Sequence, residues 1–466
     1  MSEYRTETDS MGTMQVPTTA LYGAQTARAI DNFPVSGQPL PAPFLKALGL
    51  IKQHGARVNK ELDLLDSKIA LAIMDAAEEV VTGDLLGHFP VDVYQTGSGT
   101  SSNMNANEVI ANRAAQLLDR QIGDKAVHPN DHVNLGQSSN DVIPTALHIA
   151  AASEIERHLL PALKDLQQQL EIKARKFDAI IKIGRTHLQD ATPIRLGQVF
   201  SGYARQAELA IQRIINARND LFELPLGGTA VGTGINTHPQ FAAKVIAGIG
   251  EVTGLPFREA DNHFEAQASK DAVVATSAAL KSAAIALFKI ANDIRFLASG
   301  PRCGIGELQL PAVQPGSSIM PGKVNPVMAE SLIQVCAQVV GADAAITVGG
   351  LSGNFELNVM MPLMAYNLLQ AIEILGNAVQ LFSKRCVEGL EANRARCAEL
   401  VEQSLAMVTI LAPAIGYDRA ADLAKQASAS GKTIREVVRE AKLLSDEELD
   451  KILDPWPMTE PGLGSD

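Results

Sequence analysis

The feature that most constrains the fold of this chain is an apolar stripe in the run from about residue 265 to residue 299. Apolar side chains recur in this run every seven positions, at Val273, Leu280, Leu287 and Ile294. A stripe with this period lies along one side of an α-helix and is buried against neighbouring helices. The sequence therefore predicts a long helix that packs beside others.

Four more runs have the helical pattern, over approximately residues 144–176, 196–221, 326–348 and 359–382. The polar SSND of residues 138–141 is expected to cap the first of them. Alanine is abundant and aromatic residues make up only 4%, which suits closely packed helices better than sheets. We therefore expect a mostly α protein with a central bundle of long helices, and we expect bundles of different copies to associate as a homo-oligomer.

The chain has 466 residues, which is too long for one simple core, and it is expected to divide into domains. Residues 1–136 mix short helices with turns and form the predicted N-terminal domain. Residues 137–392 hold the five long runs and form the predicted central long-helix bundle domain. The density of charged residues rises after Asn393, and residues 393–466 are predicted to form a small helical C-terminal domain.

The charge and the cysteines exclude several kinds of partner. With a net charge of −12 and no sustained basic tract, the chain is not expected to bind nucleic acid or an anionic membrane. Its first residues are charged, and we find no stretch of the ~20 uninterrupted apolar residues that would span a bilayer. Cys303, Cys336, Cys386 and Cys397 are scattered along the chain, which predicts reduced thiols in a cytoplasmic protein.

Residues 316–326 read GSSIMPGKVNP and lie between two predicted helices. A segment this rich in glycine, proline and polar residues is a poor core element. Ser317 and Ser318 can donate hydrogen bonds, and Lys323 adds a positive charge. Asn325 before a proline is typical of a capped helix start, where unpaired N–H groups favour an anion. The loop is therefore interpreted as a mobile lid that closes over an anion.

Three more polar patches occur at predicted junctions of helices. They are TGSGTSSNMNANE at 96–108, HPNDHVN with GQSSND at 128–141, and GRTHLQDATP at 184–193, which is expected to place His187 in a turn between two helices. Clusters of this kind often only cap helices or fill turns. Their shared placement favours a common role in binding a small polar ligand.

Two other interpretations of these patches are weak. The first patch is similar to a phosphate-binding glycine loop, but it lacks the Gly-Lys-Ser/Thr ending of a P-loop. It is therefore a weak indication of nucleotide binding. His128 and His132 are spaced like metal ligands, but Pro129 follows the first of them and no HExxH pattern is present. The sequence therefore predicts no metal site.

Seven segments occur in the order that one protein family has them: GSGTSSNMNANEVIAN, HPNDHVN, QSSND, GRTHLQDATP, GGTAVGTGINT, GSSIMPGKVNP and SGNFELNV. On these motifs nearly the whole chain resembles the fumarase/aspartase superfamily, and within it the class II fumarate hydratases. The resemblance implies a mostly α, three-domain fumarase/aspartase-like fold in a homotetramer, with each active site shared by three subunits. It also implies that the protein needs no cofactor and no metal.

The reaction implied by the resemblance is the reversible hydration of fumarate to L-malate, a step of the tricarboxylic acid cycle. It proceeds by anti-addition and elimination through an aci-carboxylate, whose extra negative charge the site must stabilise. By resemblance, Ser317 is the base that takes the carbon proton, and Lys323 stabilises the charge. His187 then protonates the leaving hydroxyl, with Glu330 orienting it.

The resemblance also implies two sets of binding residues. The substrate-binding set is Ser98, Gly99, Thr100, Ser138, Ser139, Asn140, Thr186, Ser318, Lys323, Val324 and Asn325. A second, peripheral dicarboxylate site is implied at His128, Pro129, Asn130 and Asp131.

The main alternative is an aspartate ammonia-lyase of the same superfamily. Gly322 in PGKVNP and the paired serines of QSSND resemble fumarases, whereas aspartases usually have Ala and a Ser-Thr pair there. His132 and the pair Leu135-Gly136 depart from the usual fumarase pattern, next to the peripheral site. Argininosuccinate and adenylosuccinate lyases rank lower. A non-catalytic binding protein is expected to have lost at least one of the four catalytic candidates, and all four are present.

Overall fold

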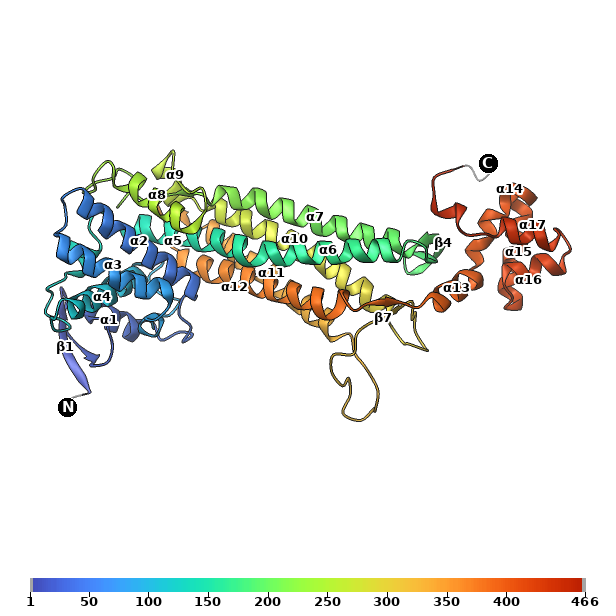
Figure 1. The fold of residues 1–466 in the computed structure, drawn as a ribbon, viewed down its shortest axis with the longest axis horizontal. Coiled ribbons are helices and arrows are strands. Elements are labelled where there is room, and N and C mark those ends of the chain that lie inside the picture. The colour runs from blue at the N-terminus through green and yellow to red at the C-terminus, as the bar shows by residue number, and fades with distance from the viewer. Residues whose placement is uncertain (1–2, 463–466) are drawn as a thin grey trace. The chain divides into compact units, whose positions relative to one another are not determined.

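The computed structural model describes residues 3–462 and divides the chain into two compact units. The first unit comprises Met1–Pro161, Ala210–Ala284 and Val335–Asn377, and the second comprises Ala162–Leu209, Ile285–Gln334 and Ala378–Asp466. The unit boundaries fall inside long helices, which Figure 1 shows as α7, α10, α11 and α12. The expected division at residues 136 and 392 stays a prediction.

The elements of the N-terminal part follow one another in the order β1 (Tyr4–Asp9), β2 (Gly12–Pro17), α1 (Ala24–Asn32), α2 (Ala42–Glu61), α3 (Ser67–Thr82), η1 (Leu86–His88), α4 (Thr100–Leu117), η2 (Pro129–Val133), α5 (Ser139–Glu154) and η3 (Ile155–Leu159). The central part continues with α6 (Leu160–Lys176), β3 (Ile181–Thr186), β4 (Gln189–Arg195), α7 (Leu196–Asp220), β5 (Glu223–Leu224), α8 (Phe241–Thr253), β6 (Arg258–Glu259), α9 (His263–Ala268) and α10 (Asp271–Leu297). After these come β7 (Leu308–Gln309), α11 (Val327–Gly350), β8 (Gly353–Asn354), β9 (Leu357–Asn358), α12 (Met361–Phe382), η4 (Ser383–Val387) and β10 (Glu391–Ala392). The C-terminal elements are α13 (Arg394–Gln403), η5 (Leu405–Ile410), α14 (Ala412–Ile415), α15 (Tyr417–Ser430), α16 (Ile434–Glu440), α17 (Asp446–Ile452) and η6 (Pro457–Thr459).

The protein is mostly helical, as the sequence predicted, and each sheet within residues 3–462 has two strands. β1 and β2 form an antiparallel hairpin at the start of the chain. The N-terminal helices are longer than expected, since α2 has 20 residues and α4 has 18. Their apolar faces pack against one another and make the core of this part, in which Phe44, Leu48 and Ile73 are fully buried.

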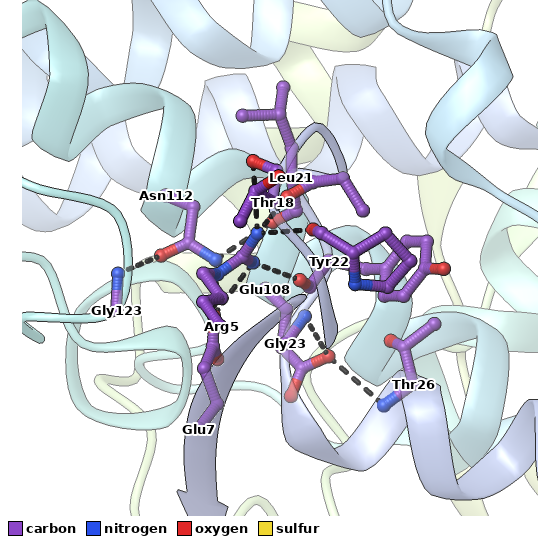
Figure 2. A network of polar contacts seen from close by, with 12 residues as sticks. Arg5, Glu7, Thr18, Leu21, Tyr22, Gly23, Thr26, Glu108, Asn112 and Gly123 are labelled. Carbon is purple, nitrogen blue, oxygen red and sulfur yellow. Dashed lines mark hydrogen bonds and ion pairs between the residues drawn. The ribbon is translucent and has the colours of Figure 1, made fainter. Parts of the chain in front are cut away.

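A polar network joins α4 to the start of α1 (Figure 2). The Glu108 carboxylate of α4 accepts hydrogen bonds from the backbone N–H groups of Gly23 at 2.9 Å and Thr26 at 3.1 Å. Asn112, one turn further along α4, donates to a carbonyl just before α1, and Arg5 of β1 donates to four carbonyls between the end of β2 and the start of α1. A carboxylate that satisfies the free N–H groups of a helix start stabilises that helix. The network therefore holds α4 in place against the start of α1.

The long helices pack through buried polar contacts as well as apolar ones. In the first unit, Asp343 of α11 accepts hydrogen bonds from Ser277 and Lys281 of α10. In the second unit, Tyr203 of α7 donates to Asp293 of α10 at 3.0 Å. The four residues of the predicted heptad stripe are all buried, so the expected long helix and its buried face are confirmed.

That helix is nevertheless interrupted where one continuous run from residue 265 was expected. α9 ends at Ala268, Ser269 is extended, and α10 begins at Asp271. The buried amine of Lys270 donates to the carbonyls of Ala266, Gln267 and Ser269 at 2.6 to 2.9 Å. A side-chain donor that satisfies the last carbonyls of a helix ends it as a cap does. The prediction of one continuous helix was wrong. The residue that caps α9 is a buried lysine, and in the sequence this lysine lies within a helical pattern.

The other long runs are close to their expected limits. α7, α11 and α12 match three of them within a few residues. The run expected from Pro144 begins earlier, at Ser139, because Ser138 and Asp141 form a reciprocal capping box there. Pro144 lies inside α5.

The C-terminal helices form a small separate core. Leu411, Val438 and Leu449 are fully buried in it, and Ile183 of β3 packs into the same cluster within the second unit. A separate C-terminal domain over residues 393–466 stays a prediction, and residues 463–466 lie outside the described residues.

By length and hydropathy alone, α10 and α11 are able to cross a membrane, which the sequence did not lead us to expect. The core helices of globular proteins meet the same criterion. Of the most apolar 18-residue segment of each helix, 44% is buried inside the structure in α10 and 39% in α11. The contact of Lys281 with Asp343 described above gives these helices a polar pairing of the kind found in protein cores.

Candidate active site

The loop from Gly316 to Asn325 is closed at its base. Gly316 N–H donates to the Lys323 carbonyl at 2.8 Å, and the Asn325 side-chain amide donates to the Gly316 carbonyl at 2.6 Å. A Cβ on Gly316 would lie 2.6 Å from the Lys323 oxygen, so only glycine allows this approach. Asn325 was expected to cap the following helix. Its side chain instead closes the loop, because the Gly316 carbonyl is within its reach.

Ser317 lies just inside this closure. Its Oγ accepts hydrogen bonds from the backbone N–H groups of Ile319 at 3.2 Å and Met320 at 3.1 Å. N–H groups aimed at a hydroxyl oxygen stabilise negative charge on it. The turn therefore favours Ser317 as an alkoxide, the form that a serine base requires.

Lys323, Ser318 and Val324 are exposed on the same loop. The Lys323 ammonium has no hydrogen-bond or ion-pair partner anywhere in residues 3–462. Glu330 lies in the first turn of α11, half-buried, and its carboxylate likewise has no partner in this part of the chain. A cation and a carboxylate that are both unpaired remain available for a ligand.

His187 lies at the tip of the β3–β4 hairpin, where a simple turn between helices was expected. Thr186 pairs with Gln189, so His187 and Leu188 form a two-residue turn. Both have positive φ, 56° and 61°, as the favoured two-residue hairpin turn requires. Thr186 and His187 are exposed at this tip, and the hairpin thus presents the imidazole away from the core.

A buried ion cluster anchors the hairpin. Glu307 is fully buried and its carboxylate oxygens lie 3.1 Å from Arg185 Nη1, next to the tip. Lys182 of β3 lies 3.3 Å from the same carboxylate. Burial lowers the pKa of Lys182, and Glu307 opposes this shift. Because a buried carboxylate must be paired, Glu307 fixes the strand that leads to His187.

Two helix N-termini meet in the first unit. Gly99 precedes α4 with φ 75°, and a Cβ there would lie 2.9 Å from Ile143 of α5. Ser98 Oγ and Thr100 Oγ1 are 2.9 Å apart at the start of α4. Unpaired N–H groups and helix dipoles favour an anion at such positions. Thr100 and its neighbours therefore lie in a setting suited to carboxylate binding.

The start of α5 completes this cluster. Asn103 Nδ2 of α4 donates to Ser139 Oγ at 3.0 Å, which links the two helix starts directly. Ser138 caps α5, and Asn140 donates to the carbonyl of Ala230 at 2.8 Å. The structure thus brings together the serines, threonine and asparagine that the sequence proposed from two separate patches.

The proposed peripheral residues lie together in the π-helical turn η2. His128 Nδ1 accepts from the backbone N–H of Asp131 at 3.0 Å, and His132 Nδ1 accepts from the N–H of His128 at 2.9 Å. His128, Pro129 and Asn130 also line a cavity of about 280 Å³. In residues 3–462 there is no group of three or more His, Cys, Asp or Glu side chains arranged to hold a metal ion.

The catalytic candidates of the second unit make no hydrogen bonds or ion pairs with one another in residues 3–462. Across the described residues, no hydrogen bond joins Ser317 to His187, and none joins Lys323 to Glu330. The chain therefore presents the candidate base and the candidate acid on separate elements.

Sequence reasoning missed the polar residues behind the serine cluster. Lys52 of α2 is fully buried, and its amine donates to Asn134 and Gln137. Its signal in the sequence was a lysine surrounded by apolar residues at helical spacing, from Leu48 to Ala56.

Comparisons with known proteins show to which family the chain belongs. A family model described as "Lyase" matches residues 12–341, and one described as "Fumarase C C-terminus" matches residues 407–460. The class II fumarate hydratase of Halobacterium salinarum is 56% identical over 464 residues, covering 99% of each chain. Fumarate hydratase 1, mitochondrial, of Arabidopsis thaliana is 53% identical and covers 99% of this chain and 94% of the relative. The crystal structure of recombinant class II fumarase from Schistosoma mansoni has a TM-score of 0.94 at 42% identity, covering 98% of this chain and 99% of the other.

The fold and these matches define the chain as a member of the lyase family. Within that family it belongs to the class II fumarate hydratases, since the similarity runs over its full length.

Proposed function

We propose that this protein catalyses the reversible hydration of fumarate to L-malate. The single observation that carries the proposal is the turn at Ser317, whose hydroxyl oxygen accepts hydrogen bonds from two backbone N–H groups beside the unpaired Lys323. Membership of the class II fumarate hydratases supports it. The relatives named above are fumarate hydratases, so the ammonia-lyase alternative is not favoured.

In the malate-to-fumarate direction, Ser317 as the alkoxide takes the proton from the carbon beside one carboxylate. The electron pair moves onto that carboxylate and gives the aci-carboxylate. Lys323 and the N–H groups of the loop stabilise the added charge. His187 then donates a proton to the hydroxyl on the next carbon, with Glu330 orienting it, and water leaves as the double bond forms.

The proposal also includes the residues that bind the substrate carboxylates. The proposed set is Ser98, Gly99, Thr100, Ser138, Ser139, Asn140, Thr186, Ser318, Lys323, Val324 and Asn325. The paired helix N-termini at α4 and α5 support a role in anion binding. The peripheral dicarboxylate site at residues 128–131 belongs to the same proposal.

We include in the proposal a homotetramer whose active sites draw on three subunits. Ser317 and His187 lie on separate elements and share no hydrogen bond in the described residues, which supports a site completed by other copies. The exposed apolar residues Ile285 and Phe288 on α10 support association through the long helices. The four cysteines are free, which supports a cytoplasmic location, and metal-independent catalysis in the tricarboxylic acid cycle completes the proposal.

The experiment that tests the proposal follows the ultraviolet absorbance of fumarate. The purified protein is incubated with L-malate and, separately, with L-aspartate, in the presence of a chelator. Fumarate from malate alone is the expected result. If fumarate forms from aspartate alone, the leaving group is ammonia and not water. If fumarate forms from neither substrate, the proposal is overturned.

A further inference from the structure

A chain of buried and partly buried hydrogen bonds begins at Lys52 and ends at Ser139. Lys52 Nζ donates to Asn134 Oδ1 and to Gln137 Oε1, both at 2.9 Å. Asn134 Oδ1 accepts a second bond, from Asn103 Nδ2 at 3.2 Å, and the same Nδ2 donates to Ser139 Oγ at 3.0 Å. All of these residues belong to the first unit. The chain therefore connects a fully buried cation to a proposed substrate-binding hydroxyl.

The direction of every bond in this chain follows from Lys52. The Lys52 amine donates to both amides, and the atoms of Asn134 and Gln137 that face it are their oxygens. With its oxygen turned to Lys52, Asn134 accepts from Asn103, so the atom that Asn103 presents there is its Nδ2. Asn103 Oδ1 is buried and has no partner among the described residues, so only these donated bonds hold its amide.

The consequence for Ser139 concerns its hydroxyl proton. Its oxygen already accepts from Asn103, and the hydroxyl has no acceptor of its own in the described chain. The proton is therefore left to be donated to a ligand. A carboxylate accepts hydrogen bonds and cannot donate one, so this polarity selects an ionised carboxyl group at the start of α5.

The other bonds of the two amides agree with this direction. Asn134 Nδ2 donates to the Gln137 carbonyl at 3.1 Å, and Gln137 Nε2 donates to the carbonyl of Val133 at 3.2 Å. A Cβ on Gly55 of α2 would lie 3.1 Å from Gln137 Nε2, so the absence of a side chain at Gly55 leaves room for this amide. Lys52 thus holds both amides in one orientation in a tightly packed place.

We propose that Lys52 is a positioning residue that sets the hydrogen-bond polarity of Asn134, Asn103 and Ser139, and so prepares Ser139 to donate to a substrate carboxylate. This inference rests on the proposed function, because it takes the ligand of Ser139 to be fumarate or malate. Lys52 does not touch the substrate. Its effect reaches the substrate through the two intervening amides.

The first test is Lys52→Met, which keeps the length of the side chain and removes its donors. We expect KM for L-malate to rise about 10-fold, the effect of one hydrogen bond to a charged group, while kcat changes less than about 3-fold. Lys270→Met is the matched control. Lys270 is a second buried lysine of the first unit whose pKa burial lowers to about 7, and in residues 3–462 its amine donates only to carbonyls at and just after the end of α9.

In the control variant KM should stay within about 2-fold of the wild-type value, because the loss of its buried amine affects stability and not substrate binding. If Lys52→Met is folded and its KM is also unchanged, the proposal is overturned. An inactive wild-type protein would instead remove the proposed function, so the two failures are distinguishable.

A second test does not depend on how Lys52→Met folds. Asn103→Ala leaves Lys52 paired and removes only the bridge to Ser139. We expect Asn103→Ala and Ser139→Ala each to raise KM, and the double variant to raise it little further, because both act through one hydroxyl. Effects on the logarithm of KM that simply add in the double variant would contradict the proposal.

Discussion

Ser317 is the proposed base, and its turn bears on that role. Its hydroxyl oxygen accepts two backbone hydrogen bonds, and in the proposed mechanism the same N–H groups stabilise the alkoxide. We expect Ser317→Ala to lower kcat roughly 10²–10⁴-fold, the range for loss of general base catalysis, while substrate binding remains measurable. Steady-state kinetics with L-malate checks this. Ser430→Ala, on the exposed end of α15, is the control and should keep its turnover.

Lys52 makes the stability of the protein depend on pH. Burial lowers the pKa of its amine from 10.5 to about 7, against the opposing charge of Asp141. The folded state therefore binds fewer protons than the unfolded state between these two values. Stability must rise with pH across this window, because the cost of burying a charged amine disappears as the amine is deprotonated.

We expect the unfolding midpoint in urea of the wild-type protein to rise relative to that of Lys52→Met as the pH increases from about 7 to about 10. The comparison of the two proteins at each pH removes the contribution of Lys270, which both retain. If the difference between the two urea midpoints stays constant across this range, the pKa of the Lys52 amine is not lowered.

At the scale of elements, the β3–β4 hairpin depends on Glu307. This buried carboxylate pairs with Arg185 and Lys182, and removal of one partner of a buried ion pair leaves the other charges uncompensated. We expect Glu307→Ala to lower the free energy of unfolding by about 3–5 kcal/mol and to reduce kcat, because the strand that carries His187 loses its anchor. Thermal unfolding and malate kinetics check the two effects. Glu399→Ala, which removes an exposed pair with Arg396, should leave the thermal unfolding temperature nearly unchanged.

The closed base of the 316–325 loop gives a second prediction for an element. A Cβ at position 316 would meet both the Lys323 oxygen at 2.6 Å and the Asn325 nitrogen at 2.9 Å. We expect Gly316→Ala to open the loop, to speed hydrogen exchange at residues 317–324 and to lower turnover, because Ser317 and Lys323 lose their relative position.

The control for this variant is Gly202→Ala. Gly202 lies inside α7, and a Cβ there would meet nothing within 4 Å. The substitution should stabilise the protein by about 0.5–1 kcal/mol, because alanine favours a helix interior, and should leave exchange in the loop unchanged. Unaltered loop exchange in Gly316→Ala would contradict the role given to the closed base.

For the whole molecule, the decisive question is how copies associate. On α10, Ile285 is 58% exposed and Phe288 is 39% exposed, although the other face of the same helix is buried. We expect Ile285→Glu to shift the protein to smaller species in light scattering and to abolish activity, since the proposed site draws on several subunits. Val252→Glu on α8, where the residue is also 58% exposed, is the control and should remain a tetramer. A monomeric wild-type protein with full activity would remove the shared site.

The helices were predicted better than the hairpin, for a physical reason. The stripe from Val273 to Ile294 is a periodic pattern, and periodicity reports the buried side of a helix directly. The turn at His187 and Leu188 has positive φ at both residues but neither glycine nor asparagine, so the usual signal of a two-residue hairpin is missing. The break at Ser269 was missed because its cap is the buried amine of Lys270.

By itself, the sequence determined that the chain is mostly helical and which polar segments stand at the ends of its helices, because apolar period and helix breakers act over a few residues. It also carried the motifs that place the chain in its family. Only the tertiary structure decided which polar groups meet. Lys52 and Asn134 are 82 positions apart, and Arg185 and Glu307 are 122 apart. The orientation of buried amides and the pairing of buried charges depend on what each group faces across the core, and no local pattern contains that information.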